Sequence, residues 1–194
     1  MLVPIGQKVN PIEPLDRDAL KLDLAIMSDI HIEGNGFVDE NVTELYYSEI
    51  VKGYHLILLG PDAPECGSRT LSDEQLDWFE AELDKAAESG LPIFVFNHYP
   101  CCVIGEGYER YISLLNKYDN TFLIVGHAHS APIFDVVPGE KGTPEIWVPS
   151  LTSNNDDTTG YGYMMEVYDD SITFRTYDYY TGAFTGTDMT YTIR

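Results

Sequence analysis

The chain has 194 residues, of which 44% are hydrophobic and 22% charged, so it has enough apolar material for a folded core and is not an intrinsically disordered protein. Its 32 acidic and 11 basic residues give a formal net charge of −21, and such a surface repels nucleic acids and anionic membranes. We therefore expect no nucleic-acid partner and no membrane partner. The acidity fits either a cation partner or a role in solubility alone.

Continuous apolar runs alternate with helical patterns in the first two thirds of the chain. We expect the whole chain, residues 1–194, to form a single domain. Ser72 is a good N-cap, with Gln75 as its capping-box partner, and the helix that follows should end at Ser89-Gly90. A second helix is predicted over Tyr108–Tyr118. Buried strands are predicted at Leu22–Met27, Tyr54–Leu59, Leu91–Phe96 and Thr121–Val125.

The last third of the chain is rich in strand patterns. Asp169-Asp170 lies between two of them as a predicted hairpin turn. The predicted strands are Ile133–Val137, Glu145–Val148, Tyr161–Tyr168, Ser171–Tyr179 and Met189–Ile193. The whole pattern predicts an α/β fold in which a β-sandwich is flanked by helices.

Potential metal ligands follow the predicted strands at their carboxyl ends, where α/β proteins bind ligands. Side chains two residues apart in an extended chain point the same way, and imidazole with carboxylate suits Zn, Mn or Fe. A lone histidine at a strand end is usually an ordinary loop residue, but several together favour a metal site. The residues concerned are Asp29, His31, His98, His127 and His129. The fifth histidine, His55, lies inside an apolar run and is expected to be a plain strand residue.

Three segments carry a resemblance to a known family. Ser28-Asp29-Ile30-His31 resembles the Asp-x-His motif that opens the calcineurin-like metallophosphoesterases. Asn97-His98-Tyr99-Pro100 resembles their lone-histidine motif, and Gly126-His127-Ala128-His129 resembles their closing Gly-His-x-His motif. The order and the strand-end context match over roughly Leu22–Tyr179. The resemblance implies an αββα sandwich and a two-metal phosphoester hydrolase.

The resemblance also implies a role for each matching residue. Asp29, His31 and His129 would hold one metal ion, whereas His98 and His127 would hold the second, with Asn35 completing it. We expect His98 and His127 to be catalytic residues as well. One or two Mn, Fe or Zn ions would activate a hydroxide that attacks the phosphorus of a small phosphodiester or phosphomonoester.

The chain departs from the family pattern after His31. No Gly-Asp motif follows, and the nearest match to the Gly-Asn-His motif is Gly34-Asn35-Gly36, in which Gly36 replaces the histidine. The strand–helix–strand material of this region is missing, which indicates an internal deletion that reduces one sheet. The bridging carboxylate is therefore absent unless Glu33, Asp39 or Asp62 replaces it. The exposed edge left by the deletion predicts a possible homodimer.

Two other functions remain open on the sequence. A degenerate family member would keep the fold and act as a metal- or phosphate-binding module. An unrelated β-rich interaction protein would account for the aromatic run TFRTYDYYTGAF. The three cysteines (Cys66, Cys101 and Cys102) are an odd number with two adjacent, so we expect reduced thiols and a cytoplasmic protein without a signal peptide.

Overall fold

The computed structural model describes residues 14–27, 45–61, 69–129, 132–151 and 160–193. The chain divides into two compact units, each built on one β-sheet. Unit 1 comprises Met1–Ile30, His129–Pro132 and Val148–Arg194, and unit 2 comprises His31–Ala128 and Ile133–Trp147. The predicted α/β fold with two sheets is confirmed.

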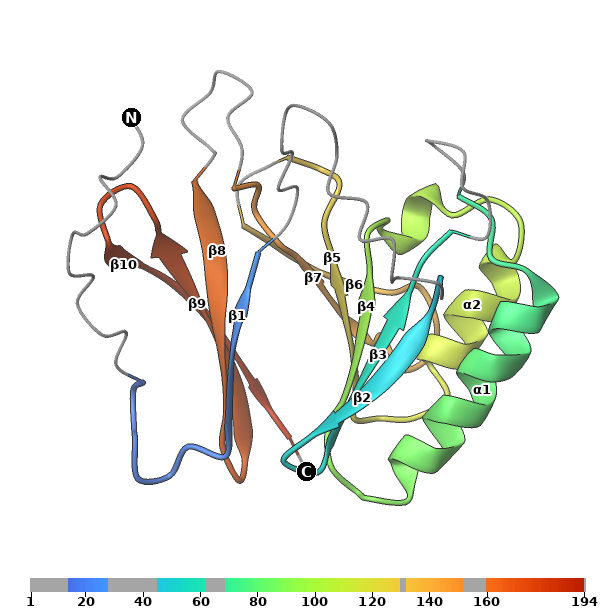
Figure 1. The fold of residues 1–194 in the computed structure, drawn as a ribbon, viewed down its shortest axis with the longest axis horizontal. Coiled ribbons are helices and arrows are strands. Elements are labelled where there is room, and N and C mark those ends of the chain that lie inside the picture. Colours follow the sequence, from blue (N-terminus) through green and yellow to red (C-terminus); the bar gives the residue numbers. More distant parts are fainter. Residues whose placement is uncertain (1–13, 28–44, 62–68, 130–131, 152–159, 194) are drawn as a thin grey trace. The chain divides into compact units, whose positions relative to one another are not determined.

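Unit 2 contains a six-stranded mixed sheet (Figure 1). Its strands, in spatial order, are β2 (Tyr47–Val51), β3 (Tyr54–Leu59), β4 (Ile93–Asn97), β5 (Thr121–Val125), β7 (Pro144–Trp147) and β6 (Ile133–Val136). Strands β3, β4, β5 and β7 are parallel, while β2 and β6 pair antiparallel at the two edges. The four parallel strands therefore bring their carboxyl ends to one edge of the sheet, with Asn97 in register with Val125.

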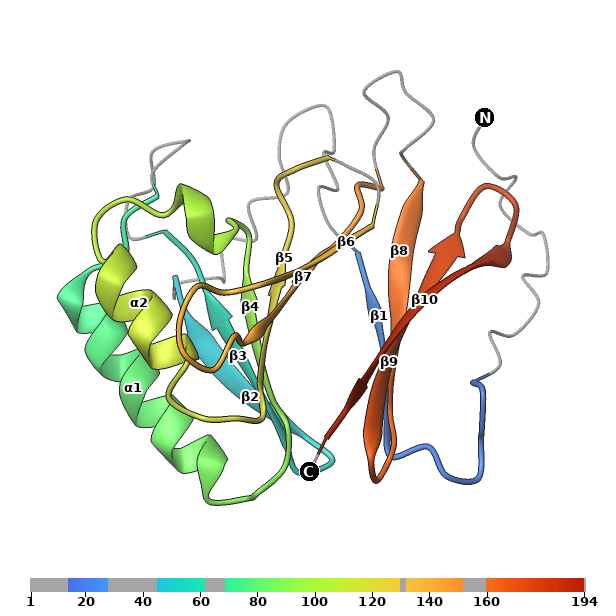
Figure 2. The same ribbon diagram turned by 180° about the vertical axis from the view of Figure 1, so that it is seen from behind.

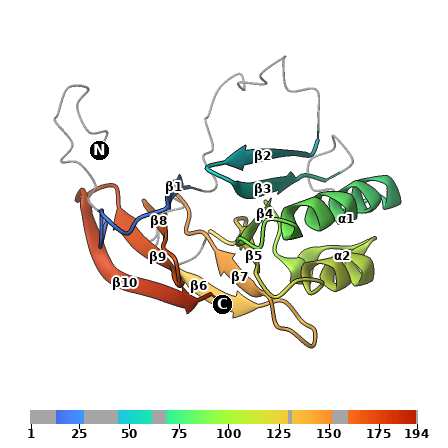
Figure 3. The ribbon, with the colours of Figure 1, turned by 90° about the horizontal axis from the view of Figure 1, so that it is seen from below.

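Two helices, α1 (Asp73–Ala87) and α2 (Tyr108–Leu115), cover the same face of this sheet (Figures 1 and 3). The predicted N-cap is confirmed, because the Ser72 hydroxyl accepts the Gln75 N–H at 3.1 Å. The Gln75 side chain donates to the Gly60 carbonyl at 2.8 Å, which ties the start of α1 to the end of β3. The core between helices and sheet includes Leu76, Phe79, Leu83, Leu115, Ile57, Val95 and Leu123.

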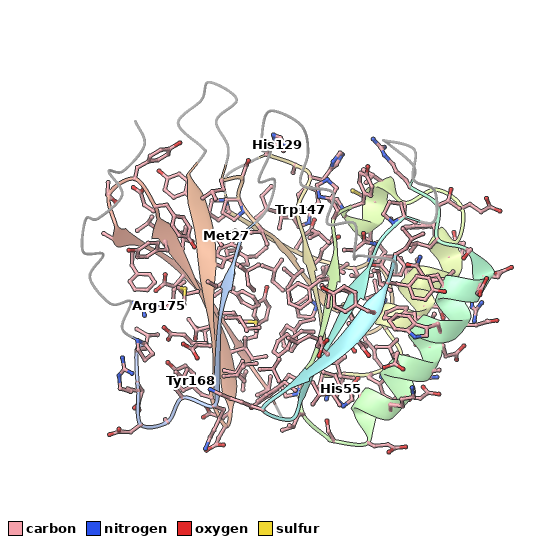
Figure 4. All side chains as sticks on the ribbon, in the orientation of Figure 1. Met27, His55, His129, Trp147, Tyr168 and Arg175 are labelled. Atoms are coloured by element: carbon pink, nitrogen blue, oxygen red, sulfur yellow. The ribbon has the colours of Figure 1, made fainter. Side chains whose placement is uncertain are left out.

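Unit 1 contains a four-stranded antiparallel sheet in the order β1 (Leu22–Ile26), β8 (Tyr161–Val167), β9 (Ser171–Asp178), β10 (Ala183–Thr192) (Figure 2). The predicted hairpin turn is confirmed, since the Tyr168 N–H donates to the Ser171 carbonyl at 2.8 Å. A polar cluster is buried in this sheet. Arg175 binds Glu166 at 2.8 Å, and the Tyr168 hydroxyl donates to the same carboxylate at 2.6 Å. Figure 4 labels Arg175 and Tyr168 on this sheet.

Several element bounds differ from the prediction. Strand β2 was not predicted as a separate element, and β4 begins two residues later than expected. Helix α2 ends at Leu115 rather than Tyr118, because the Asn116 side chain donates to the Ile112 carbonyl at 2.8 Å and closes the last turn. Strand β10 begins earlier than Met189, and the bulge between Phe184 and Asp188 hides its pattern in the sequence. No helix in the described ranges is long and apolar enough to span a membrane.

Candidate functional site

His98 directly follows strand β4, and His127 is the second residue after the neighbouring parallel strand β5, so the two histidines meet at the carboxyl edge of the sheet. The Gly126 N–H donates to the His98 carbonyl at 3.0 Å, so one backbone hydrogen bond continues the pairing beyond the strands. The two imidazole ring centroids are 5.2 Å apart at an interplanar angle of 76°. His98 is exposed and His127 is half-buried, which leaves the pair accessible to a solute.

The turn after β4 presents His98 through the side chain of Asn97. The Asn97 amide oxygen accepts the Tyr99 N–H at 3.2 Å, which forms an Asx turn. The Asn97 amide nitrogen lies 3.5 Å from the hydroxyl of Tyr111, which is completely buried, and this burial raises the pKa of that phenol. The turn is thus anchored from below by the core, while His98 stays at the surface.

His127 occupies a strained backbone position. Its φ is +71°, and the Ala128 N–H donates to the Gly126 carbonyl at 2.8 Å. A hydrogen bond across three residues with positive φ at the centre defines the rare, strained form of the γ-turn. His129 also has a positive φ, of +47°. Strain of this kind is typical of functional sites, where the surrounding structure holds it in place.

Tyr99 packs against both histidines. Its ring centroid is 4.9 Å from that of His98 and 4.7 Å from that of His127. On the Tyr99 ring lies Arg69, whose guanidinium carbon is 5.6 Å from the ring centroid. The Tyr99 ring therefore contacts both an exposed cation and the histidine pair.

A buried carboxyl group holds the next segment of the same loop. Glu145 on β7 is 2% exposed and accepts the Cys101 N–H at 2.7 Å, and the Cys101 thiol lies 3.4 Å from its second oxygen. Burial, and then the neighbouring Glu145, raises the pKa of the Cys101 thiol to about 12. Cys101 and Cys102 are both free thiols. Glu145 thus fixes the chain three residues beyond His98.

The structure brings together two of the six predicted metal ligands, His98 and His127. His129 belongs to unit 1, whereas the pair belongs to unit 2. Asp29, His31 and Asn35 lie outside the described residues, as do the candidate bridging residues Glu33, Asp39 and Asp62. His55 lies at the start of β3, at the opposite end of the parallel strands from the pair, as an ordinary strand residue (Figure 4).

The ring spacing of the pair is one that two ligands of a single metal ion would have. Two imidazoles bound to one tetrahedral ion at about 2.0–2.1 Å have ring centroids about 5 Å apart, and the observed spacing is 5.2 Å. Among the described residues, no group of three or more His, Cys, Asp or Glu side chains lies close enough to hold a metal. A complete site therefore needs ligands from beyond this pair.

Three residues of the site were not identified from the sequence: Arg69, Tyr99 and Glu145. Tyr99 lies inside the lone-histidine motif Asn97–Pro100, but the motif requires no metal ligand at that position. Glu145 has a detectable signal, because a carboxyl group inside the apolar strand PEIWV is expected to be buried and hydrogen-bonded. Arg69 has none, since its position over Tyr99 depends on the pairing of two loops.

Comparisons with known proteins give a single kind of match. No family model and no curated protein matches the chain. Among solved structures, the chain is similar to a single mutant of Vps29 from Entamoeba histolytica, at 13% identity and a TM-score of 0.33. That match covers 82% of this chain and 67% of the other. A match at this level bears on neither activity nor partners.

Proposed function

We propose that this protein is a metal-dependent phosphoester hydrolase acting on a small phosphodiester or phosphomonoester. The observation that carries the proposal is the His98–His127 pair, which meets at the carboxyl edge of a parallel sheet with the ring spacing of two ligands of one ion. The motif resemblance supplies the remaining ligands. Asp29, His31, Asn35 and His129 would complete a site for one or two Mn, Fe or Zn ions.

A bound metal ion would lower the pKa of a water molecule and neutralise negative charge on the phosphoryl group. The chain itself supplies the positioning. The γ-turn fixes the His127 backbone, the Asx turn of Asn97 fixes His98, and Glu145 holds the loop that follows. The exposed His98 leaves an open approach for a small substrate. Ligands preorganised in this way lose little freedom when metal or substrate binds.

A second candidate function is a metal- or phosphate-binding module without turnover. The missing Gly-Asp motif favours it. Such a module would keep the His98–His127 pair and its support but lack the bridging carboxylate needed to hold two ions close together.

Hydrolysis of bis-p-nitrophenyl phosphate with Mn²⁺ tests the first proposal. The wild type should be active and His127→Ala inactive, whereas His55→Ala serves as a matched control because His55 lies at the far end of the parallel strands. Activity that survives in His127→Ala would refute the proposed site. No activity in the folded wild type would favour the binding module.

Thermal unfolding tests the metal site independently of turnover. A chelator should lower the melting temperature of the wild type, and Mn²⁺ should restore it, because an ion bound only to the folded state stabilises that state. His127→Ala should show no such shift. A wild type that is insensitive to both additions would contradict both candidate functions as metal-binding proteins.

We expect the protein to act in the cytoplasm. The exposed Cys102 is a free thiol, as suits a reducing compartment. A homodimer formed through an exposed strand edge is a further part of the proposal.

A further inference from the structure

Arg69 is held at the site by the pairing of two loops in unit 2, one following β3 and one following β4. The Gly105 N–H donates to the Arg69 carbonyl at 3.0 Å, and the Leu71 N–H donates to the Glu106 carbonyl at 3.1 Å. Gly107 permits this close approach, because its φ is +87° and a Cβ there would lie 2.4 Å from the Leu71 carbonyl oxygen. The Arg69 backbone is therefore fixed relative to the loop that carries His98.

The Arg69 side chain continues a line of contacts that ends at the histidines. Its guanidinium carbon lies 5.6 Å from the Tyr99 ring centroid, and the Tyr99 ring lies 4.7 Å from the His127 ring. Tyr99 thus contacts the cation through the face of its ring and also lies against both histidines. Contact with a ring face uses none of the guanidinium N–H donors, so these groups stay available for a ligand.

The setting of Arg69 differs from that of Arg110 and Lys117, two other cations in unit 2. Arg110 lies 2.6 Å from Asp77 and 3.3 Å from Glu80, and Lys117 lies 3.0 Å from Glu80 and 2.5 Å from Asp84. Those cations neutralise the acidic face of α1. In the part of the chain that the structure describes, the Arg69 guanidinium contacts an aromatic ring instead of a carboxylate. In a chain of net charge −21, such a cation creates a local preference for an anion.

We propose that Arg69, oriented by Tyr99, binds the phosphoryl oxygens of the substrate beside the His98–His127 pair. The planar guanidinium presents paired N–H donors that match two phosphoryl oxygens, which a lysine ammonium does not reproduce. This inference rests on the proposed function, since it assigns the anion-binding part of the same site. The ligand is the phosphoryl anion itself, whether in an ester or as inorganic phosphate.

Calorimetric titration of inorganic phosphate, at fixed pH and ionic strength, tests the inference with and without Mn²⁺. Arg69→Gln should weaken phosphate binding about tenfold or more, because it removes a charge-assisted pair of hydrogen bonds. The phosphate affinity of Arg69→Lys should lie between that of the wild type and that of Arg69→Gln. Lys52→Gln is the matched control, since it makes the same charge change in the exposed turn between β2 and β3. It should leave phosphate binding unchanged within about twofold.

A second pair of variants tests the aromatic platform. Tyr99→Leu should weaken phosphate binding, and Tyr99→Phe should restore it relative to Tyr99→Leu, because the ring face orients the cation. Mn²⁺ binding should stay unchanged in Arg69→Gln but be lost in His127→Ala. This difference separates a role in anion recognition from general damage to the site.

Three results would overturn the inference: a wild type that binds no phosphate, an Arg69→Gln variant that binds it like the wild type, or an equal loss in Lys52→Gln. Failure of the proposed function has a different signature. Phosphate binding that depends on Arg69, in a protein that binds no Mn²⁺ and hydrolyses no ester, would keep this inference and refute the hydrolase.

Discussion

Replacing His127 with glycine and with alanine measures the strain stored in the γ-turn. Both variants remove the imidazole, and they differ only in how well the new residue tolerates a φ of +71°. A left-handed backbone costs an L-residue roughly 1–2 kcal/mol, and glycine is free of this cost. Glycine in turn loses roughly 0.5–1 kcal/mol more backbone entropy on folding than alanine. His127→Gly should therefore have a free energy of unfolding about 0.75 kcal/mol higher than His127→Ala, the difference between the midpoints of these two ranges.

The assay is urea unfolding with a chelator present, so that no metal contributes to stability. Ala81 provides the control, because it is exposed in the middle of α1, where the backbone is helical. Ala81→Gly should destabilise the protein by about 1 kcal/mol. Glycine in place of alanine should therefore lower the free energy of unfolding at position 81 and raise it at position 127. Both His127 variants should lose the stabilisation by Mn²⁺. A His127→Ala variant as stable as His127→Gly would refute the strain argument.

Three more predictions concern the loop support, the buried thiol and the sheet edge. Glu145→Ala should lower the free energy of unfolding by about 3 kcal/mol in urea titration, since it leaves the buried Cys101 N–H unsatisfied and opens a cavity. Glu145→Gln keeps an acceptor and should cost only about 1 kcal/mol, so equal losses would contradict the role of this hydrogen bond. The pKa of the Cys101 thiol is about 12 in the folded protein and about 8.5 in the unfolded chain. The stability that the protonated thiol contributes is therefore complete below about pH 8.5 and is lost as the pH rises from there toward 12. Alkaline unfolding curves should therefore fall less steeply in Cys101→Ala than in the wild type, and parallel curves would exclude this linkage. Ile50 is 62% exposed on the edge strand β2, so Ile50→Lys should convert the expected homodimer to a monomer by light scattering, and a wild-type monomer at high concentration would disprove the dimer.

Local patterns in the sequence were sufficient for most of the secondary structure. The runs Tyr54–Leu59 and Thr121–Val125 coincide with β3 and β5, and the Ser72 cap begins α1. These features depend on side chains within a few residues of one another, so they are legible in one stretch of chain. Strand β10 was only partly recognised because Gly186, at a φ of +80°, lies in the bulge that interrupts its alternation.

The sequence by itself determined the chemistry available at the site, since imidazoles after buried strands identify a candidate for metal binding. Only the tertiary structure decided which of them meet. His98 and His127 lie together because β4 and β5 are parallel neighbours in register, and that pairing depends on contacts far apart in the chain. The same holds for Glu145 beneath Cys101 and for Arg69 on Tyr99. Residue type is a local property of the chain, whereas proximity is a property of the packed fold.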